Sequence, residues 1–326
     1  MTTAAILETP MQSENAAADE LARLVSGATV IRRGEPLAKR TTLRVGGPAD
    51  VYVEPASEND LAAVLKFCAA RGLNFFVLGR GSNLLVRDGG FRGVVICLAQ
   101  PAFSRIEIAG ERLNCGAGAK LKNIAVEAKR NGLAGLEFLE GIPGSVGGAL
   151  RMNAGAMNGA TFDIIESVRV MDFNRNIREL TPQRMAVEYR CCATLKTHIA
   201  LGAVLKGRPD AREAIEQRMN DYSKKRWASQ PAMSSAGCAF KNPAGHSAGR
   251  LIDELGLKGT RVGGAVVSAE HGNFIVNDGT ATARDVLQLM EILKQRVKAE
   301  RGIDLHTEVE IIGEDSCTTK KQRNQD

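Results

Sequence analysis

Aromatic residues are scarce in this sequence. Phe, Tyr and Trp make up 4% of the 326 residues, and there is one Trp. Proteins that bind nucleic acid stack bases on such rings, so a nucleic-acid-binding module is disfavoured even though the net charge is +6. Such a module would predict salt-sensitive binding and no bound chromophore. The basic residues are spread along the chain, and anionic small-molecule substrates explain their excess equally well.

Long hydrophobic runs and secretion signals are also missing. No run reaches the roughly 18 apolar residues that a membrane-spanning helix needs. The first residues, Met1 to Ala5, lack the basic start and the apolar core of a signal peptide. We therefore expect a cytoplasmic protein that has no membrane partner.

The spacing of cysteine and histidine gives no sign of a metal site. The 7 cysteines are an odd number without a C-x-x-C motif, and the 4 histidines do not cluster with them at zinc-like spacing. Reduced thiols and no bound metal are the simplest expectation. With 326 residues, 44% of them hydrophobic, the chain is long enough for two or three packed domains.

Helical and strand-like patterns alternate irregularly along the chain, which predicts an α+β fold. The predicted helices are residues 13–25 (capped by Ser13 and stopped by Gly27), 58–71, 121–131, 211–227, 247–255 and 283–301 (capped near Thr282). The predicted strands are residues 49–54, 75–78, 93–98, 105–108, 112–116, 165–173, 200–205, 265–267, 273–276 and 308–312. Pro209 and Asp210 mark a domain boundary, and the polar tail after Gly313 is expected to be disordered.

A first glycine-rich motif follows the predicted strand at residues 75–78. It consists of Gly79, Arg80, Gly81, Ser82 and Asn83. Glycines let backbone N–H groups converge on an anion, and the serine and asparagine add side-chain donors, which suits a pyrophosphate. A simple tight turn is the alternative, because short glycine patterns are common.

A second glycine-rich segment spans residues 141–149 and includes Gly144, Ser145 and Gly148. Apolar residues are interleaved with its glycines, and the segments on either side have regular helix or strand patterns. These features favour a backbone that approaches a flat cofactor closely, and they disfavour a simple linker. The glycine spacing does not fit the Rossmann fingerprint, and no βαβ unit with an acidic residue about 20 positions on is visible. A nicotinamide dehydrogenase is therefore disfavoured.

Three separate residues could carry acid–base or electrostatic chemistry. Arg190 offers a permanent charge and a planar donor fork that can hold a carboxylate or an enolate, although a solvated surface arginine is the alternative. Cys238 follows small residues, and a thiol with an ordinary pKa of about 8.5 can donate a proton at neutral pH; a small buried residue is the alternative. Glu308 lies on an alternating strand whose polar face could equally be exposed to solvent.

Taken in order, these motifs resemble those of the UDP-N-acetylenolpyruvoylglucosamine reductase family. No one motif is specific, but the ordered set is. The resemblance covers almost all of residues 40–313, and its motifs are residues 41–50, 79–83, 135–144, 152–156, 238–243, 271–277 and 307–313.

The resemblance implies an FAD-binding module of the vanillyl-alcohol-oxidase (PCMH) type with two subdomains, followed by an α+β substrate-binding domain. The expected parts are a peripheral arm at 1–27, an FAD-binding domain at 28–208 divided near 100, a substrate-binding domain at 209–313 and a tail at 314–326. The two glycine-rich segments would then hold the FAD pyrophosphate and flavin.

The resemblance also implies the reaction. Family members pass a hydride from NADPH through FAD to the enolpyruvyl group of UDP-N-acetylenolpyruvoylglucosamine, giving UDP-N-acetylmuramate for peptidoglycan synthesis. Arg190 and Glu308 match the positions that polarise the carboxylate and stabilise the enolate, and Glu308 must carry its proton to help an anion. Cys238 matches the proton donor, which is usually serine in the family.

The expected substrate-binding residues are Tyr189, Arg226, Lys241 and Asn242, which match family positions near the nucleotide sugar. The nearest alternative is another flavoenzyme on the same fold, such as an oxidase that passes electrons to oxygen. An oxidase need not carry Arg190, Cys238 and Glu308 in this arrangement.

Overall fold

A computed structural model describes residues 10–316 of the chain. Two compact groups of segments are distinguished: unit 1 comprises residues 10–35, 50–82 and 93–232, and unit 2 comprises residues 36–49, 83–92 and 233–316. The predicted domain limits at 28–208 and 209–313 stay predictions. The predicted disorder of the tail concerns mainly residues 317–326, which lie outside the described part.

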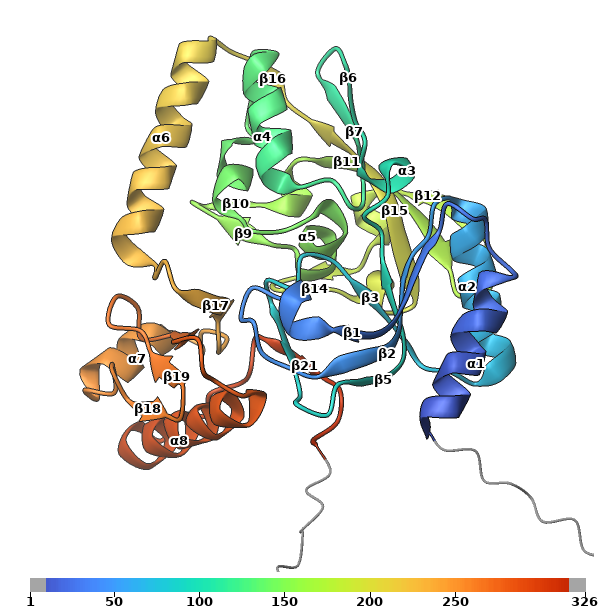
Figure 1. Ribbon diagram of the computed structural model, residues 1–326. Helices are drawn as coiled ribbons and strands as arrows, with labels where there is room; N and C mark the ends of the chain where they lie inside the picture. Colours follow the sequence, from blue (N-terminus) through green and yellow to red (C-terminus); the bar gives the residue numbers. More distant parts are fainter. Residues whose placement is uncertain (1–9, 317–326) are drawn as a thin grey trace, which may run out of the picture. The chain divides into compact units, whose positions relative to one another are not determined.

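Unit 1 contains a four-stranded sheet in the order β1-β2-β5-β3 (Figure 1). Its strands are β1 (Val30–Pro36), β2 (Pro48–Glu54), β3 (Phe75–Leu78) and β5 (Phe91–Cys97). Helix α2 (Glu58–Arg71) begins where the Ser57 side chain accepts a hydrogen bond from Asp60 N and ends at Gly72, whose φ is 60°. Leu61, Val64, Leu65 and Cys68 are buried along one face of this helix, which confirms the helical pattern predicted for residues 58–71.

A second sheet of unit 1 is antiparallel and has the order β12-β11-β15-β7-β6. Its strands are β6 (Ile106–Ala109), β7 (Arg112–Gly116), β11 (Ile165–Asp172), β12 (Ile177–Leu180) and β15 (His198–Lys206). One hydrophobic core contains buried residues from both sheets, including Val53, Leu113 and Val168. This core is the scaffold on which the glycine-rich segments of unit 1 are mounted.

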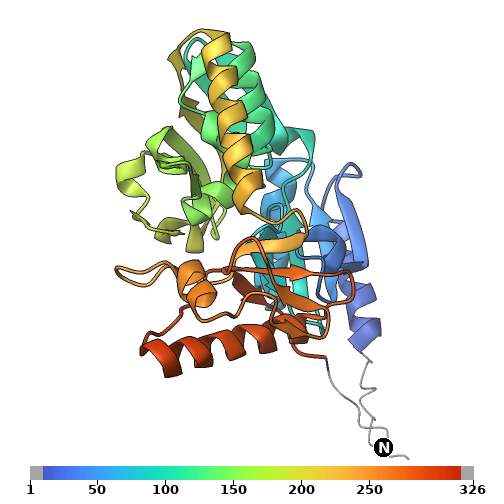
Figure 2. The same cartoon turned by 90° about the vertical axis from the view of Figure 1, so that its left-hand side faces the viewer.

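The longest helix of unit 1, α6 (Arg212–Ser229), runs alongside α4 (Leu121–Arg130) in both Figure 1 and Figure 2. Glu216 on α6 pairs with Lys129 on α4 at 2.7 Å. Arg218 donates to Glu137, a carboxylate that is 6% exposed and also accepts from Gly135 N. Because breaking one partner of a buried ion pair is costly, this contact holds α6 to the body of unit 1.

The remaining elements of unit 1 are short. They are α1 (Pro10–Ala22), α3 (Pro101–Ser104), α5 (Val146–Met152), β8 (Leu133–Ala134), β9 (Gly155–Ala156), β10 (Gly159–Ala160), β13 (Val187–Glu188), β14 (Cys191–Cys192), β16 (Arg208–Pro209) and the 3-10 helices η2 (Glu137–Gly141), η3 (Thr161–Asp163), η4 (Pro182–Arg184) and η5 (Ala193–Lys196). Helix α5 contacts β7, β14 and β15, so it anchors the second glycine-rich segment on the antiparallel sheet.

Unit 2 is built around an antiparallel sheet in the order β17-β20-β19-β18 and a separate parallel pair of β21 with β4. Its elements are η1 (Leu37–Arg40), β4 (Leu84–Val86), β17 (Ser234–Cys238), α7 (Ala248–Glu254), β18 (Arg261–Val262), β19 (Ala265–Val267), β20 (Phe274–Asn277), α8 (Ala283–Arg301) and β21 (Glu310–Ile312). Leu251, Val267, Leu289 and Leu293 belong to one buried cluster, so α7, α8 and the sheet share a core.

Both ends of helix α8 are fixed by local capping interactions. Thr282 accepts a hydrogen bond from Asp285 N, and the Asp285 carboxylate accepts one from Thr282 N, which is a complete capping box. Asp88 accepts further bonds from Ala283 N and Arg284 N. The helix ends at Gly302, whose φ is 70°, so the predicted helix and its cap are confirmed.

Three sequence predictions were wrong in detail. Helix α1 starts at Pro10, where the first helical turn tolerates proline, and ends at Ala22, so Ser13 lies inside it and Gly27 does not stop it. Glu308 precedes β21, because the strand pairing with β4 begins at Glu310. Strand β17 was missed, since its sequence of small and polar residues carries no strand signal.

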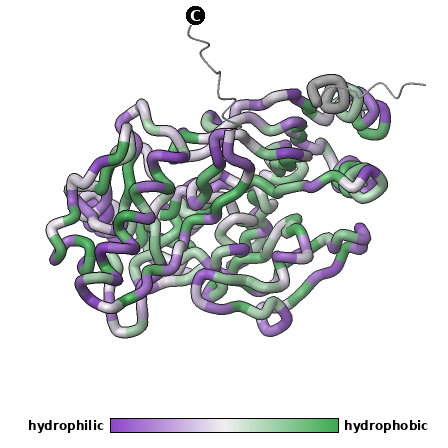
Figure 3. The backbone as a smooth tube through the Cα atoms, turned by 90° about the horizontal axis from the view of Figure 1, so that it is seen from below, coloured by the Kyte–Doolittle hydropathy of each residue, from purple (hydrophilic) through white to green (hydrophobic). Residues whose placement is uncertain are grey.

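Hydrophilic and hydrophobic residues alternate at short intervals along the backbone (Figure 3). Among the helices of residues 10–316, none combines the length and the apolar character needed to cross a bilayer.

Candidate active site

The two glycine-rich segments approach each other within unit 1. A Cβ atom on Gly79 would lie 2.9 Å from the Ser145 Oγ and 3.9 Å from the backbone N of Gly148. Gly79 and Gly148 are exposed, whereas Ser145 is buried. The missing side chains therefore leave a backbone surface that a flat or anionic ligand can approach closely.

The second segment becomes a helix rather than an open loop. Ser145 is the N-cap of α5, but its side chain makes no capping bond. The first backbone N–H groups of α5, those of Val146 and Gly147, donate to Ala119 O and Ala117 O. These bonds fix the start of the helix, so Gly148 is presented on a rigid element. Sequence could not reveal this helix, because glycine has a low helix propensity.

The first segment turns sharply before unit 2 begins. Gly81 is buried and has φ of 60°, a conformation that glycine adopts without cost. Arg80 is exposed and Ser82 is half-buried. Asn83 belongs to unit 2, where its Nδ2 donates to Glu308 O at 3.2 Å. Gly79 is therefore placed beside the second glycine segment, and Asn83 is placed beside Glu308.

Arg190 occupies a strained position at the tip of the hairpin formed by β13 and β14. Its φ is 56°, which is uncommon for a residue with a side chain and is retained where surrounding structure enforces it. Its guanidinium lies 5.1 Å from the centroid of the Tyr189 ring, and its Nε is buried. Strand β14 contacts α5, so the hairpin lies on the helix that carries the second glycine segment.

Two predicted substrate residues also belong to unit 1. Tyr189 is 61% exposed beside Arg190. Arg226, near the end of α6, lies close enough to Gly141 that a Cβ there would be 3.9 Å from its guanidinium nitrogen. Burial lowers the pKa of Arg226, and the nearby Glu140 carboxylate opposes that shift. A partly buried cation at this end of the glycine segment is suited to an anionic ligand.

Cys238 ends strand β17 directly after an irregularity in the sheet. The register against β20 shifts between Ser235 and Cys238, and Gly237 between them has φ of 76°. Such a bulge changes the direction in which the next side chain points. The Cys238 residue is half-buried, so its thiol is accessible in part to a small molecule.

Cys238 and Glu308 are brought together within unit 2. Glu308 N donates to Ala239 O at 2.9 Å, and Phe240 forms an isolated bridge with Thr307. The two residues thus lie on adjacent segments although 70 positions separate them in the chain. A thiol and a carboxyl on neighbouring segments can act on one substrate group.

The remaining two predicted substrate residues follow Cys238. The Lys241 side chain is exposed, while its backbone N–H donates to His306 O. The Asn242 Oδ1 accepts from Ala248 N at 3.0 Å and so supports the start of α7. The sequence did not predict this structural contact of Asn242.

Asn273 was not singled out from the sequence. Its side chain bonds both backbone groups of Phe240, 33 positions away. No local pattern signals such a contact, because both partners of the asparagine are backbone atoms.

The half-buried His271 ring is engaged by its neighbours within unit 2. Its Nδ1 accepts from Asn273 N at 3.1 Å, and its ring lies against Gly249 and the edge of Phe274. Burial lowers the pKa of His271, the Lys258 charge adds to this, and the Asp253 charge opposes it. These contacts favour a structural role for His271.

Lowering the pH is expected to destabilise the fold through His271. Below the ordinary histidine pKa of about 6.5, the unfolded chain binds a proton that the folded state takes up only at lower pH, so stability present above pH 6.5 is lost as the pH falls. When the pH is lowered from 7.5 to 5.5, the melting temperature of the His271→Gln variant should fall by less than that of the wild type. The exposed His246, changed to Gln, is the control, and an equal loss in wild type and H271Q would contradict the assignment.

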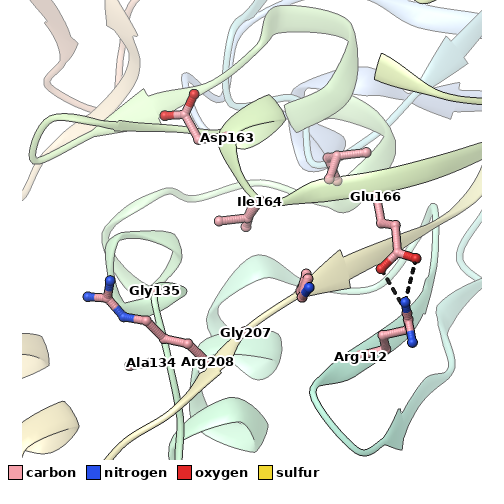
Figure 4. A pocket seen from close by; sticks show the side chains of 10 residues that line it. Arg112, Ala134, Gly135, Asp163, Ile164, Glu166, Gly207 and Arg208 are labelled. Atoms are coloured by element: carbon pink, nitrogen blue, oxygen red, sulfur yellow. Dashed lines mark hydrogen bonds and ion pairs between the residues drawn. The ribbon is translucent and has the colours of Figure 1, made fainter. Parts of the chain in front are cut away.

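Unit 1 also has an open pocket of about 550 Å³ lined by Arg112, Gly135, Asp163, Glu166 and Arg208 among others (Figure 4). Arg112 and Glu166 form a bidentate ion pair across one wall, with donor–acceptor distances of 2.7 and 2.8 Å. None of the predicted site residues lines this pocket. Within it, Arg112 and Glu166 neutralise each other, and Asp163 accepts from Ala160 N.

Comparison with protein families supports the arrangement described above. Residues 49–181 match the family model for an FAD binding domain. Residues 230–312 match that for the C-terminal domain of UDP-N-acetylenolpyruvoylglucosamine reductase. The fold is accordingly a mixed α+β fold with an FAD-binding domain followed by the C-terminal domain of that family.

Individual relatives extend the match over most of the chain. A UDP-N-acetylenolpyruvoylglucosamine reductase of Clostridium botulinum is 43% identical over 284 residues, covering 86% of this chain and 92% of the relative. That of Clostridium kluyveri is 42% identical, covering 87% and 94%. The crystal structure of the reductase from Thermus caldophilus matches with a TM-score of 0.75 and 41% identity, covering 87% of this chain and 99% of that chain. The chain therefore belongs to the UDP-N-acetylenolpyruvoylglucosamine reductase family.

Proposed function

We propose that the protein reduces UDP-N-acetylenolpyruvoylglucosamine to UDP-N-acetylmuramate with NADPH and FAD, a step of peptidoglycan precursor synthesis. The observation that carries the proposal is 43% identity to a reductase of this name over 86% of the chain. The geometry supports it independently, because Cys238 and Glu308 lie on adjacent segments of the domain that matches the family's C-terminal part. The proposal places the reaction in the cytoplasm.

The residues present in unit 1 fit an FAD. Gly79 and Gly148 are exposed, and a side chain at Gly79 would meet Ser145 of the opposite segment. The residues proposed to hold the cofactor are Gly79, Arg80, Gly81, Ser82, Asn83, Gly144, Ser145 and Gly148. When bound, FAD accepts a hydride from NADPH and supplies it to the methylene carbon of the enolpyruvyl group.

The chain's own residues then have separate tasks. The Arg190 guanidinium binds the substrate carboxylate and favours the negative charge that develops beside it. Glu308, when protonated, donates a hydrogen bond to the same developing enolate. Cys238 gives the proton that completes the new C–H bond at the neighbouring carbon, leaving a thiolate that solvent reprotonates. Tyr189, Arg226, Lys241 and Asn242 bind the nucleotide-sugar part of the substrate.

The proposed function is tested by following the visible absorption spectrum of the purified protein under anaerobic conditions. Flavin bands should bleach on addition of NADPH and return on addition of UDP-N-acetylenolpyruvoylglucosamine. A protein that is colourless and cannot be reconstituted with FAD would refute the proposal. Rapid reoxidation by oxygen, with none by the nucleotide sugar, would point instead to an oxidase on the same fold.

Replacing Gly81 with valine should weaken FAD binding by at least about tenfold, because a β-branched residue at φ of 60° forces the turn to rearrange. The measurement is a fluorescence titration of the apoprotein with FAD. Gly110→Val is the matched control, since Gly110 also has φ of 60° but lies in the turn between β6 and β7 with no atom within 4 Å of an added Cβ. Equal losses of FAD affinity in the two variants would contradict this role of Gly81.

A further inference from the structure

Asn273 clamps one backbone position next to Cys238. Phe240 N donates to Asn273 Oδ1 at 2.9 Å, and Asn273 Nδ2 donates to Phe240 O at 2.7 Å. Ala239 N also donates to the backbone O of Asn273 at 2.8 Å. Asn273 is 3% exposed and Phe240 is fully buried. Two opposed bonds from one rigid amide fix both the position and the orientation of this peptide segment.

The hydrogen bonds of Asn273 lie next to the irregularity in the pairing of β17 with β20. The register shift before Cys238 interrupts the regular ladder between β17 and β20. A bulge bends the strand and leaves residues without ladder bonds, so the bonds that follow it help to fix where the next side chain points. After Cys238, those bonds are the ones that Asn273 makes to Ala239 and Phe240.

The same segment also carries Glu308. Ala239 O accepts from Glu308 N, and Lys241 N donates to His306 O on the far side of Phe240. The backbone of residues 239–241 thus lies between Asn273 on one side and residues 306–308 on the other. A shift of Phe240 would move Cys238 and Glu308 relative to each other.

We propose that Asn273 is a positioning residue of the reduction, which holds Cys238 and Glu308 in their common geometry through the backbone of Ala239 and Phe240. The inference deepens the proposed function and rests on the roles assigned there to Cys238 and Glu308. Asn273 itself need not touch the substrate.

Asn277 provides a matched comparison on the same strand. It is also buried, at 7% exposure, and its amide is also doubly engaged. Its Oδ1 accepts from Gly279 N at 2.7 Å, and its Nδ2 donates to Leu43 O at 3.0 Å. Losing either amide leaves buried backbone groups unsatisfied, but of the two side chains the Asn273 amide bonds to Phe240 next to Cys238, whereas the Asn277 amide bonds to Leu43 and Gly279.

The test measures the two half-reactions of the FAD-loaded enzyme separately, under anaerobic stopped flow. Asn273→Asp keeps the acceptor for Phe240 N but places a carboxylate oxygen against Phe240 O. Since a misplacement of about 1 Å can cost about 10²-fold, we expect reoxidation of the reduced enzyme by UDP-N-acetylenolpyruvoylglucosamine to be at least about tenfold slower in N273D than in N277D. Reduction by NADPH should change by less than about threefold in both variants.

A double-mutant cycle separates positioning from a general loss of structure. In a Cys238→Ala background, adding N273D should slow reoxidation by a clearly smaller factor than in the wild-type background, because one of the two groups that Asn273 positions is gone. Equal reoxidation rates in N273D and N277D, or an undiminished effect of N273D in the C238A background, would overturn the inference. If N273D does not retain flavin, Asn273→Ala is measured in the same way. Wild-type enzyme that is not reoxidised by the nucleotide sugar would instead overturn the proposed function.

Discussion

Cys238→Ala is expected to slow reoxidation of the reduced enzyme by the nucleotide sugar by about 10²–10⁴-fold, the range over which a positioned proton donor accelerates such a step. Reduction of the bound flavin by NADPH should remain near the wild-type rate, because that step needs no proton from this thiol. The half-reactions are measured in the same stopped-flow experiment. Unchanged reoxidation in C238A would remove Cys238 from the mechanism.

Cys238→Ser is the conservative partner of this variant. A hydroxyl keeps a protic donor in the same place, so reoxidation should stay within about tenfold of wild type. The serine variant should also lose the inactivation by alkylating reagents that a half-buried thiol permits. Alkylation that inactivates wild type and C238S equally would show that another cysteine, such as the half-buried Cys191, is responsible.

Local signals account for the parts of the fold that were predicted correctly. The limits of helices α2 and α8 were predicted residue for residue. A capping residue, Ser57 or Thr282, directly precedes each helical pattern in the sequence, and a glycine directly follows it. Strand β17 and the helical form of α5 were missed, since small residues give weak local preferences. Tertiary bonds, such as those of Val146 and Gly147, decide these segments instead.

In the candidate site, too, local sequence patterns identified some residues, and tertiary contacts determined the rest. Ordered motifs indicated Cys238 and Glu308, but only the backbone bond from Glu308 N to Ala239 O brings them onto adjacent segments. The strained backbone of Arg190 could not be predicted from the sequence either, because an arginine does not signal a positive φ in the way that a glycine does. Asn273 illustrates the limit most clearly, since it is specified by two backbone atoms that any residue at position 240 would present.

Arg190→Gly is expected to separate stability from activity. Glycine adopts φ near 56° without the cost of about 1–2 kcal/mol that a side chain incurs there, so the melting temperature should equal or exceed that of wild type. Reoxidation by the nucleotide sugar should nevertheless fall by about 10²–10³-fold, the usual cost of losing one preorganised donor at a developing negative charge.

Arg175→Gly is the matched control for this prediction, because Arg175 has φ of 72° and occupies the turn between β11 and β12. It should gain the same relief of backbone strain without loss of activity. An R190G enzyme that turns over as fast as R175G would contradict the catalytic role of Arg190. An R190G enzyme that melts well below R175G would show that the side chain of Arg190 contributes more to the fold than its strained backbone costs. If R190G keeps its stability but loses activity, the strained arginine is maintained for the reaction. The fold by itself would be at least as stable with glycine at this position.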